Sequence, residues 1–286
     1  MKFIVKKLLE ILTRSETVRR YLEFKLNIGE YRARQDPDEI IGAIDLDVGA
    51  GKTLKAYPFG SVTQWRYDTL RTKEPETLEW IEGLGEGVLW DVGANIGLYS
   101  IYAAARTNLT VLAFEPAPVN YFILTRNIHL NRFDERVMPY AIAFSNRSEA
   151  ALFNMGSLQP GGAMGHFGES VEQVKAGDHV NEINYRQAML GFSIDEFVKM
   201  FNPAFPNFMK IDVDGIENKI IQGGMKTFSD PRFKSLSIEV DDREVEYNRG
   251  LMADIEACGL KMISKKHSAM FEGGPFATLY NYVFGK

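Results

Sequence analysis

The chain has 286 residues, of which 45% are hydrophobic, with one cysteine and a formal net charge of −5 at pH 7. A chain of this length can bury a core in one large domain or two small ones, and a single cysteine excludes an internal disulfide framework. Its apolar runs are far shorter than the roughly 20 residues of a membrane-spanning helix, so the sequence predicts a soluble, cytoplasmic protein.

The amino-terminal segment differs in charge from the rest of the chain. Residues 1–26 hold seven basic and three acidic residues, a net charge of +4, which leaves −9 for the remainder. Apolar residues recur there at helical spacing, which predicts one or two amphipathic helices. We expect them to pack on their own domain or on a second subunit of a homo-oligomer, with contact to an anionic membrane surface as the alternative. An acidic main domain without a basic stripe argues against a nucleic-acid partner.

Residues 1–75 are predicted to form an extension of helices and short strands ahead of the main domain. The stretch DVGAGKTLKAYPFGSV, residues 47–62, is rich in turn formers and favours short strands. Pro75 suits the first turn of a helix, and Glu76 suits its positively polarised end. The main domain is therefore expected over residues 76–286.

From residue 87 onward, short apolar strands alternate with helices. This alternation is typical of an α/β protein with a doubly wound, mostly parallel sheet. The predicted elements are strands at 88–92, 110–115, 137–144, 208–213 and 236–240, with helices at 96–105 and 118–130. Ligands bind such sheets outside the carboxyl ends of the strands, so the polar residues that follow each strand are the candidate site.

The first of these strand ends carries an acid beside a glycine-rich turn. Asp91 directly precedes the turn that contains Gly93, Asn95 and Gly97. A carboxylate there repels a pyrophosphate and attracts an ammonium group, since unit charges about 4 Å apart interact by about 4 kcal/mol at an effective dielectric of about 20. The methionyl amine of S-adenosylmethionine satisfies this preference. Asn95 is expected to be left-handed, and Glu115 is placed to accept hydrogen bonds from ribose hydroxyls.

Three motifs resemble those of a known family. The sequences VLWDVGANIGLYS, AFEPAPVNYFILTRNIHLN and FMKIDVDGIENKIIQGG are similar to the FkbM-type methyltransferases, a branch of the class I S-adenosylmethionine-dependent enzymes, in a match over roughly residues 60–286. The resemblance implies a Rossmann-like domain with a seven-stranded sheet, helices on both faces and an antiparallel last strand at TLYNYVFG. Members of the family mostly methylate hydroxyl groups of sugars, glycans or polyketide natural products, and the resemblance implies the same activity here.

The resemblance also assigns cofactor-binding residues. It implies that the segment around Ser145 flanks the adenine and that four residues bind the cofactor, namely Asp91, Gly93, Gly97 and Glu115. We include Asn95 and Pro116 in the same predicted site. Structural alternatives stay open, because Asp91 and Glu115 also suit helix caps and Ser145 is an ordinary turn residue.

Methyl transfer to a hydroxyl requires more than alignment, because the hydroxyl is weakly acidic. The expected base is Asp212 or Asp214, with its pKa raised in a crowded acidic site, while Lys210 stabilises the developing charge. His166 is an alternative base, because imidazole titrates near neutrality. The other mechanism uses a hard cation such as Mg²⁺, with ligands drawn from Asp212, Asp214, Asp241 and Asp242.

The segment near residues 154–192 is expected to act as a lid over a small-molecule or glycan acceptor. It contains five glycines between residues 156 and 168, which predicts a mobile loop that folds over the acceptor. Two other classes of function stay open. One is a methyltransferase of the same fold acting on nitrogen or carboxylate, and the other is a nicotinamide- or nucleotide-binding protein.

Overall fold

The computed structural model describes residues 43–168, 183–274 and 276–286. The helices predicted over residues 1–26 therefore lie outside the described residues. Residues 44–286 group into one compact unit. In the described part of the chain, no helix is both long enough and apolar enough to cross a membrane.

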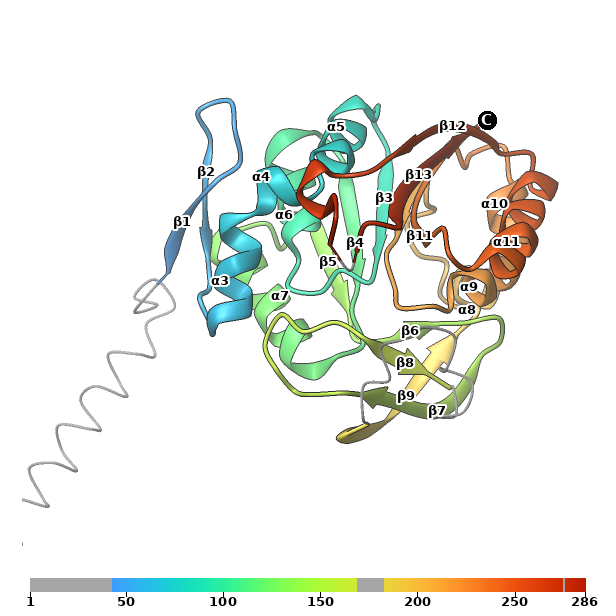
Figure 1. The fold of residues 1–286 in the computed structure, drawn as a ribbon, viewed down its shortest axis with the longest axis horizontal. Helices are drawn as coiled ribbons and strands as arrows, with labels where there is room; N and C mark the ends of the chain where they lie inside the picture. The colour runs from blue at the N-terminus through green and yellow to red at the C-terminus, as the bar shows by residue number, and fades with distance from the viewer. Residues whose placement is uncertain (1–42, 169–182, 275) are drawn as a thin grey trace, which may run out of the picture. The chain divides into compact units, whose positions relative to one another are not determined.

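A seven-stranded sheet forms the centre of this unit (Figure 1). Its strands are β3 (Val88–Val92), β4 (Thr110–Phe114), β5 (Val137–Tyr140), β10 (Phe208–Ile211), β11 (Ser235–Asp241), β12 (Lys261–Lys266) and β13 (Leu279–Gly285). Their order is β12-β13-β11-β10-β3-β4-β5. Strand β13 runs antiparallel to both of its neighbours, whereas β10, β3, β4 and β5 pair in parallel. The predicted Rossmann-like sheet with an antiparallel last strand is confirmed.

Helices cover both faces of this sheet. One face packs against α5 (Pro75–Gly83), α6 (Leu98–Arg106) and α7 (Pro118–Leu130), and the other against α8 (Ile194–Phe201), α9 (Glu217–Gly223), α10 (Met225–Ser229) and α11 (Val245–Ala257). Successive residues of a strand point to opposite faces, so Leu89 joins the first core and Trp90 the second. Burial on both faces explains why the central strands are almost continuously apolar.

The segment after β5 builds a second, smaller sheet. Its strands are β6 (Ala143–Phe144), β7 (Glu149–Met155), β8 (Gly165–Phe167) and β9 (Tyr185–Phe192), in the order β6-β9-β7-β8. The single strand predicted over 137–144 is thus divided between two sheets. The physical reason is that residues 143–144 pair with β9, a partner more than 40 residues away, which no local pattern reveals.

Residues 44–73 pack on the large sheet's helices. They form the hairpin β1 (Ile44–Asp47) and β2 (Thr53–Ala56), followed by α3 (Ser61–Asp68) and α4 (Leu70–Lys73). The expected short strands are confirmed. Two asparagines hold this segment. Asn127, within α7, accepts from the Tyr57 N–H at 2.8 Å, and Asn131, the C-cap of α7, accepts from the Lys55 N–H at 2.8 Å. The boundary drawn at residue 75 stays a prediction, although residues 44–75 belong to the same compact unit.

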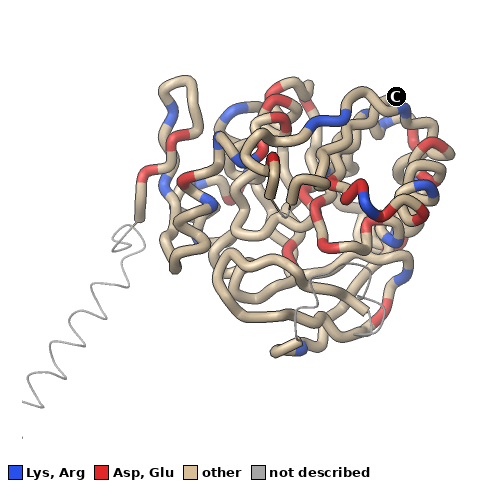
Figure 2. The backbone as a smooth tube through the Cα atoms, in the orientation of Figure 1, with Lys and Arg blue, Asp and Glu red and all other residues tan. Residues whose placement is uncertain are grey.

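Acidic and basic residues are interspersed along the described backbone (Figure 2). Many form exposed pairs, such as Lys55 with Asp45 at 2.5 Å and Arg249 with Glu246 at 2.8 Å. Exposed pairs contribute little to stability. The buried charges at the carboxyl ends of β3 and β10 are different, and they mark the candidate site.

Candidate active site

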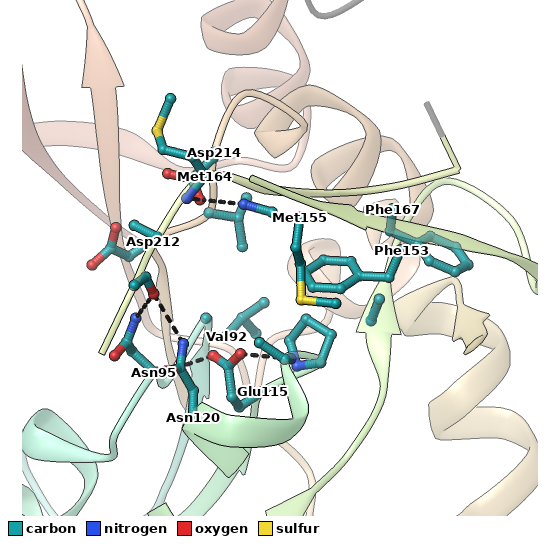
Figure 3. A pocket seen from close by; sticks show the side chains of 18 of the residues that line it. Val92, Asn95, Glu115, Asn120, Phe153, Met155, Met164, Phe167, Asp212 and Asp214 are labelled. Carbon is teal, nitrogen blue, oxygen red and sulfur yellow. Dashed lines mark hydrogen bonds between the residues drawn. The ribbon is translucent and has the colours of Figure 1, made fainter. Parts of the chain in front are cut away.

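A cavity of about 310 Å³ lies at the carboxyl ends of β3, β4 and β10 (Figure 3). Its lining comes from the glycine turn after β3, from Glu115 and Pro116 after β4, and from Asp212 and Asp214 after β10. The smaller sheet and its loops supply the apolar wall, which includes Phe153. This is the edge at which doubly wound sheets bind their ligands.

The glycine turn requires backbone conformations that other residues rarely adopt. Gly93, Asn95 and Gly97 have φ values of 82°, 50° and 81°, so the left-handed conformation predicted for Asn95 is confirmed. A Cβ atom on Gly93 would lie 1.9 Å from the carbonyl oxygen of Asp212, and one on Gly97 would lie 2.3 Å from Leu124 Cδ1. The turn therefore approaches β10 and α7 as closely as backbone atoms allow.

Asp91 lies at the end of β3 and is fully buried. Its Oδ2 accepts a hydrogen bond from the Ser100 hydroxyl at 2.6 Å, while Oδ1 has no hydrogen-bond partner among the described residues. Burial raises the pKa of Asp91, although the positive charge of Lys210 acts in the opposite direction. Its neighbours Val92 and Gly93 line the cavity, whereas the described lining does not include Asp91 itself.

Glu115 extends from the end of β4 into the cavity lining. Its carboxylate accepts from the N–H groups of Asn95 and Ala117, each at 2.8 Å. It thereby joins the glycine turn to the residue before α7, although the N-cap of α7 is Ala117 and not Glu115, and Pro116 lines the cavity beside it. Burial raises the pKa of Glu115 to about 7, while the two N–H donors act to lower it.

Ser145 is buried, and the described residues lining the cavity do not include it. Its N–H donates to the carbonyl oxygen of Phe192 at 2.9 Å. The three residues before it, Ile142, Ala143 and Phe144, line the cavity instead. The segment predicted to flank the adenine is therefore present, but Ser145 itself serves the smaller sheet.

Lys210 is buried in β10 directly opposite Asp91 in β3. Its Nζ donates to Asp212 at 2.5 Å and lies 4.7 Å from the centre of the Tyr99 ring. Burial acts to lower the pKa of Lys210, but the negative charges of Asp212, Asp91 and Glu74 outweigh it and raise that pKa. Lys210 therefore stays protonated and holds a negative charge beside the cavity.

Asp212 belongs to a larger group of charged side chains, of which Lys210 and Glu74 are buried. Its side chain is 27% exposed and faces the cavity. Burial acts to raise the pKa of Asp212, but Lys210 and Lys73 outweigh it and lower that pKa. Lys73 is also paired with Glu74, which accepts from the Tyr99 hydroxyl at 2.7 Å.

The neighbouring strand β11 adds Glu239 to the cavity lining. Burial raises the pKa of Glu239 well above its usual range, and the charges of Asp212 and Glu74 raise it further. The pKa values of Glu239 and Asp212 are therefore shifted in opposite directions. We name this group the charged cluster, and its members are Lys73, Glu74, Lys210, Asp212 and Glu239.

Asp214 holds the loop before β8 rather than standing free in the cavity. Its Oδ2 accepts from the N–H groups of Met164 at 2.5 Å and Gly165 at 3.2 Å. Burial raises the pKa of Asp214, as does the charge of Asp212, while His166 acts to lower it. Of the two aspartates offered as the base with a raised pKa, Asp214 is the one whose pKa is raised, while Lys210 lowers the pKa of Asp212. His166 lies near Asp214 but outside the described cavity lining.

Two asparagines fasten the same loop to the rest of the cavity wall. Asn95 and Asn120 both donate to the carbonyl oxygen of Gly162, at 2.8 Å and 2.9 Å, and Asn120 accepts from the Gly161 N–H at 2.8 Å. Figure 3 shows both side chains turned toward this point. Mobility of this loop as a lid stays a prediction.

A family model for the methyltransferase FkbM domain matches residues 91–262. The chain belongs to the FkbM methyltransferase family. It is an S-adenosylmethionine-dependent methyltransferase, and the nicotinamide- or nucleotide-binding alternative is therefore wrong.

Several known proteins resemble this FkbM methyltransferase. The hexuronic acid methyltransferase AglP of Haloferax volcanii is 28% identical over 184 residues, which cover 63% of this chain and 69% of AglP. Methyltransferase 1 of Beauveria bassiana is 24% identical over 141 residues, 46% of this chain and 56% of that protein. Among solved structures, a putative tRNA (m1A22) methyltransferase of Streptococcus pneumoniae in complex with S-adenosyl-L-methionine has a TM-score of 0.44 and 12% identity, covering 73% of this chain and 72% of that chain.

The described residues of this FkbM methyltransferase fit the cofactor of its family. Gly93 has no side chain, and a Cβ atom at this position would collide with the carbonyl oxygen of Asp212, next to the end of β10. Asp91 has a buried oxygen without a partner among the described residues, and an ammonium group would satisfy it. Glu115 keeps lone pairs for hydroxyl donors even with two N–H groups bound. The individual cofactor contacts stay predictions.

Replacing Asp91 with asparagine is expected to weaken binding of S-adenosylhomocysteine by about ten- to hundredfold, since a charge-assisted hydrogen bond contributes roughly 1.5–3 kcal/mol. Titration calorimetry measures the affinity. Ser100→Ala is the matched control, because it removes only the hydroxyl that Asp91 accepts from. Unchanged affinity in the Asp91→Asn variant would show that Asp91 serves only Ser100 and Lys210.

Cofactor affinity is expected to fall as the pH falls through the pKa of Glu115, which burial raises to about 7. Only the ionised carboxylate offers all its lone pairs to ribose hydroxyls, so binding is favoured above that pKa and lost below it, by about tenfold one pH unit below. Calorimetry with S-adenosylhomocysteine between about pH 6 and about pH 8 tests this.

Two variants check that assignment. Glu115→Gln should bind weakly with little pH dependence. Burial also raises the pKa of Glu217 to about 7, but the described cavity lining does not include Glu217, so Glu217→Gln should keep the pH dependence. A pH profile that disappears in Glu217→Gln and persists in Glu115→Gln would contradict the assignment.

The residues predicted to bind Mg²⁺ do not fit a metal site. Asp241 accepts from Arg243 at 2.6 Å, and Asp242 pairs with Lys265 and accepts from the Tyr282 hydroxyl at 2.6 Å. Neither aspartate is among the described residues that line the cavity. No group of three or more His, Cys, Asp or Glu side chains in the described ranges is arranged to hold a metal ion. The two acids at the end of β11 are thus paired with Arg243 and Lys265.

Sequence patterns missed two residues that the fold brings to the cavity, namely Lys73 at the end of α4 and Asn120 in the first turn of α7. They also missed buried Glu74, which pairs with Lys73 but is not in the described cavity lining. Strand alternation does indicate Glu239, because Glu239 is two residues before Asp241 on the same strand. Glu74 carried no such signal, because an acid before a proline helix start normally lies on the surface.

Proposed function

We propose that this methyltransferase methylates a hydroxyl group of a sugar, glycan or natural product. The observation that carries the proposal is Asp212, which faces the cavity in its ionised form while Lys210 donates to it at 2.5 Å. A hydroxyl must lose its proton as its oxygen attacks, whereas a neutral amine needs less help from a base. An ionised carboxylate at this place therefore favours a hydroxyl acceptor.

In the proposed reaction, Asp212 accepts the proton of the acceptor hydroxyl. S-adenosylmethionine, held near the glycine turn and Glu115, supplies an electrophilic methyl group. Lys210 and Lys73 keep Asp212 ionised before the reaction, because their charges lower its pKa. Asp212 is therefore the base of the charged cluster, and Glu239 lines the same cavity.

Asp214 has a different proposed role. Two backbone N–H groups of the loop before β8 already occupy its Oδ2. A proton transferred to Asp214 would weaken these two hydrogen bonds and loosen the loop. We therefore assign Asp214 to holding the loop at Met164 and Gly165, which lines the cavity. His166 has no part in the proposed reaction.

The proposed acceptor class agrees with the wall of the cavity and with one relative. AglP, a protein similar to this chain over most of its length, is described as a hexuronic acid methyltransferase. The cavity offers apolar surfaces from Phe153, Met155 and Phe167 and an aromatic residue at Trp65. Sugar rings have apolar faces as well as hydroxyl groups, so a mixed wall of this kind suits them.

Methyl transfer from ¹³C-labelled S-adenosylmethionine to a panel of sugars, uronic acids and amines tests the proposal. The chemical shift of the labelled methyl carbon separates ethers, esters and N-methyl products. Mild alkali then releases methanol from an ester and leaves an ether intact. An ether product supports the proposal, while an ester or N-methyl product with no ether would replace it with carboxyl or nitrogen methylation.

A further inference from the structure

One basic side chain in the cavity lining has unused hydrogen-bond donors. Arg66, in α3, donates from Nε to the carbonyl oxygen of Gly161 at 2.6 Å. Its two terminal nitrogens have no hydrogen-bond or ion-pair partner within the described residues. Lys73, the other basic residue of the described lining, is already paired with buried Glu74. Within the described ranges, Arg66 is thus the lining cation that remains available to a ligand.

The bond to Gly161 determines which part of the guanidinium stays available. A guanidinium binds a carboxylate bidentately through two nitrogens that share one edge. With Nε engaged, the edge formed by the two terminal nitrogens remains. The carbonyl that holds Nε is itself fixed, because Asn120 accepts from the Gly161 N–H at 2.8 Å and donates to Gly162 at 2.9 Å. The guanidinium group of Arg66 is therefore held in place before any ligand binds.

The surroundings of Arg66 select an anionic group at this one place. Four acidic residues line the same cavity, namely Glu115, Asp212, Asp214 and Glu239. Arg66 lines this cavity together with Glu115 and Asp212, and its charge acts to lower the pKa of both carboxyl groups. A ligand carboxylate would be repelled near the ionised acids and attracted beside Arg66.

We propose that Arg66 is a carboxylate-binding residue of this cavity. Two ligands carry such a group into it. One is the cofactor, through the α-carboxylate of its methionyl part, and the other is an acidic sugar acceptor, through its uronic carboxylate. Only the second source rests on the proposed function.

Calorimetry with the full chain and three probes distinguishes these sources. S-adenosylhomocysteine carries the methionyl-type carboxylate, and 5′-methylthioadenosine has the same nucleoside thioether without the amino acid. Glucuronate, titrated in the presence of S-adenosylhomocysteine and compared with glucose, reports the acceptor side. The variants are Arg66→Gln and Arg66→Lys. Arg71→Gln is the matched control, because Arg71 pairs with exposed Asp47 and is outside the described cavity lining.

If the cofactor is the source, Arg66→Gln weakens S-adenosylhomocysteine binding by at least about tenfold and leaves methylthioadenosine binding unchanged. If the acceptor is the source, both adenosine ligands bind normally, while the wild-type preference for glucuronate over glucose is lost in Arg66→Gln. In either case Arg66→Lys recovers part of the affinity, and Arg71→Gln behaves as wild type.

Two results would overturn the proposal. An equal loss of S-adenosylhomocysteine and methylthioadenosine binding would show that Arg66 only holds Gly161, and no change with any probe would show that it binds no ligand carboxylate. Ether formation on sugars, measured with the labelled cofactor, is independent of both results. Hydroxyl methylation therefore stands or falls separately from the role of Arg66.

Discussion

Replacing Asp212 with asparagine is expected to lower turnover by about 10²–10⁴-fold, the range that a positioned base contributes. Asparagine has nearly the same shape, so it keeps the approach of Gly93 to the backbone of residue 212. It cannot accept the hydroxyl proton. Affinity for S-adenosylhomocysteine should remain close to that of the wild type, and initial rates of label transfer measure the loss.

Two other aspartates serve as comparisons for Asp212. Asp241→Asn changes an acid on the adjacent strand that is paired with Arg243, and it should leave turnover unchanged. Asp214→Asn should raise the Michaelis constant for the acceptor more than it lowers turnover, because a neutral amide oxygen holds the N–H groups of Met164 and Gly165 more weakly than a carboxylate does. Normal turnover in Asp212→Asn, together with a large loss in Asp214→Asn, would transfer the role of base to Asp214.

Replacing Gly93 with alanine is expected to abolish measurable cofactor binding. The new Cβ atom would lie 1.9 Å from the carbonyl oxygen of Asp212, which is backbone and cannot rotate away. The φ of 82° adds strain for any residue with a side chain. The left-handed backbone costs roughly 1–2 kcal/mol and overpacking roughly 1–3 kcal/mol more. Relieving this clash requires the ends of β3 and β10 to separate, which would move the turn away from the cavity.

Gly85→Ala is the control for this substitution. Gly85 lies in the same chain region before β3, and a Cβ atom there meets nothing within 4 Å. Thermal unfolding and calorimetry should show a lower midpoint and no binding for Gly93→Ala, with wild-type values for Gly85→Ala. Normal binding in Gly93→Ala would mean that the close approach to β10 is dispensable.

Local patterns predicted the large sheet well because its order depends on local chemistry. Strands buried on both faces must be apolar along their length, and the helices between them carry their own start signals, such as Pro118 in α7. The left-handed Asn95 was predictable for the same reason, because few residues tolerate that backbone. Strand β6 was not separable from β5, because its partner β9 is remote in sequence.

The catalytic roles were less predictable, because they depend on which charges are neighbours. In the sequence, nothing distinguishes the four aspartates at these two strand ends, namely Asp212, Asp214, Asp241 and Asp242. In the fold, Asp212 contacts Lys210, Asp214 holds backbone N–H groups, and the last two pair with Arg243 and Lys265. The hydrogen-bond and ion-pair partners therefore differ from one aspartate to the next.

By itself the sequence determined the family, the order of the central strands and helices, and the turn beside Asp91, because backbone conformation and two-sided burial restrict residue types locally. Only the tertiary structure decided that Lys73 and Glu74 from the extension meet Glu239 beside Asp212, and that Arg66 faces the same cavity. Electrostatic interactions act through space over several ångströms. The charge state of the site therefore depends on residues more than 160 positions apart, which no local pattern relates.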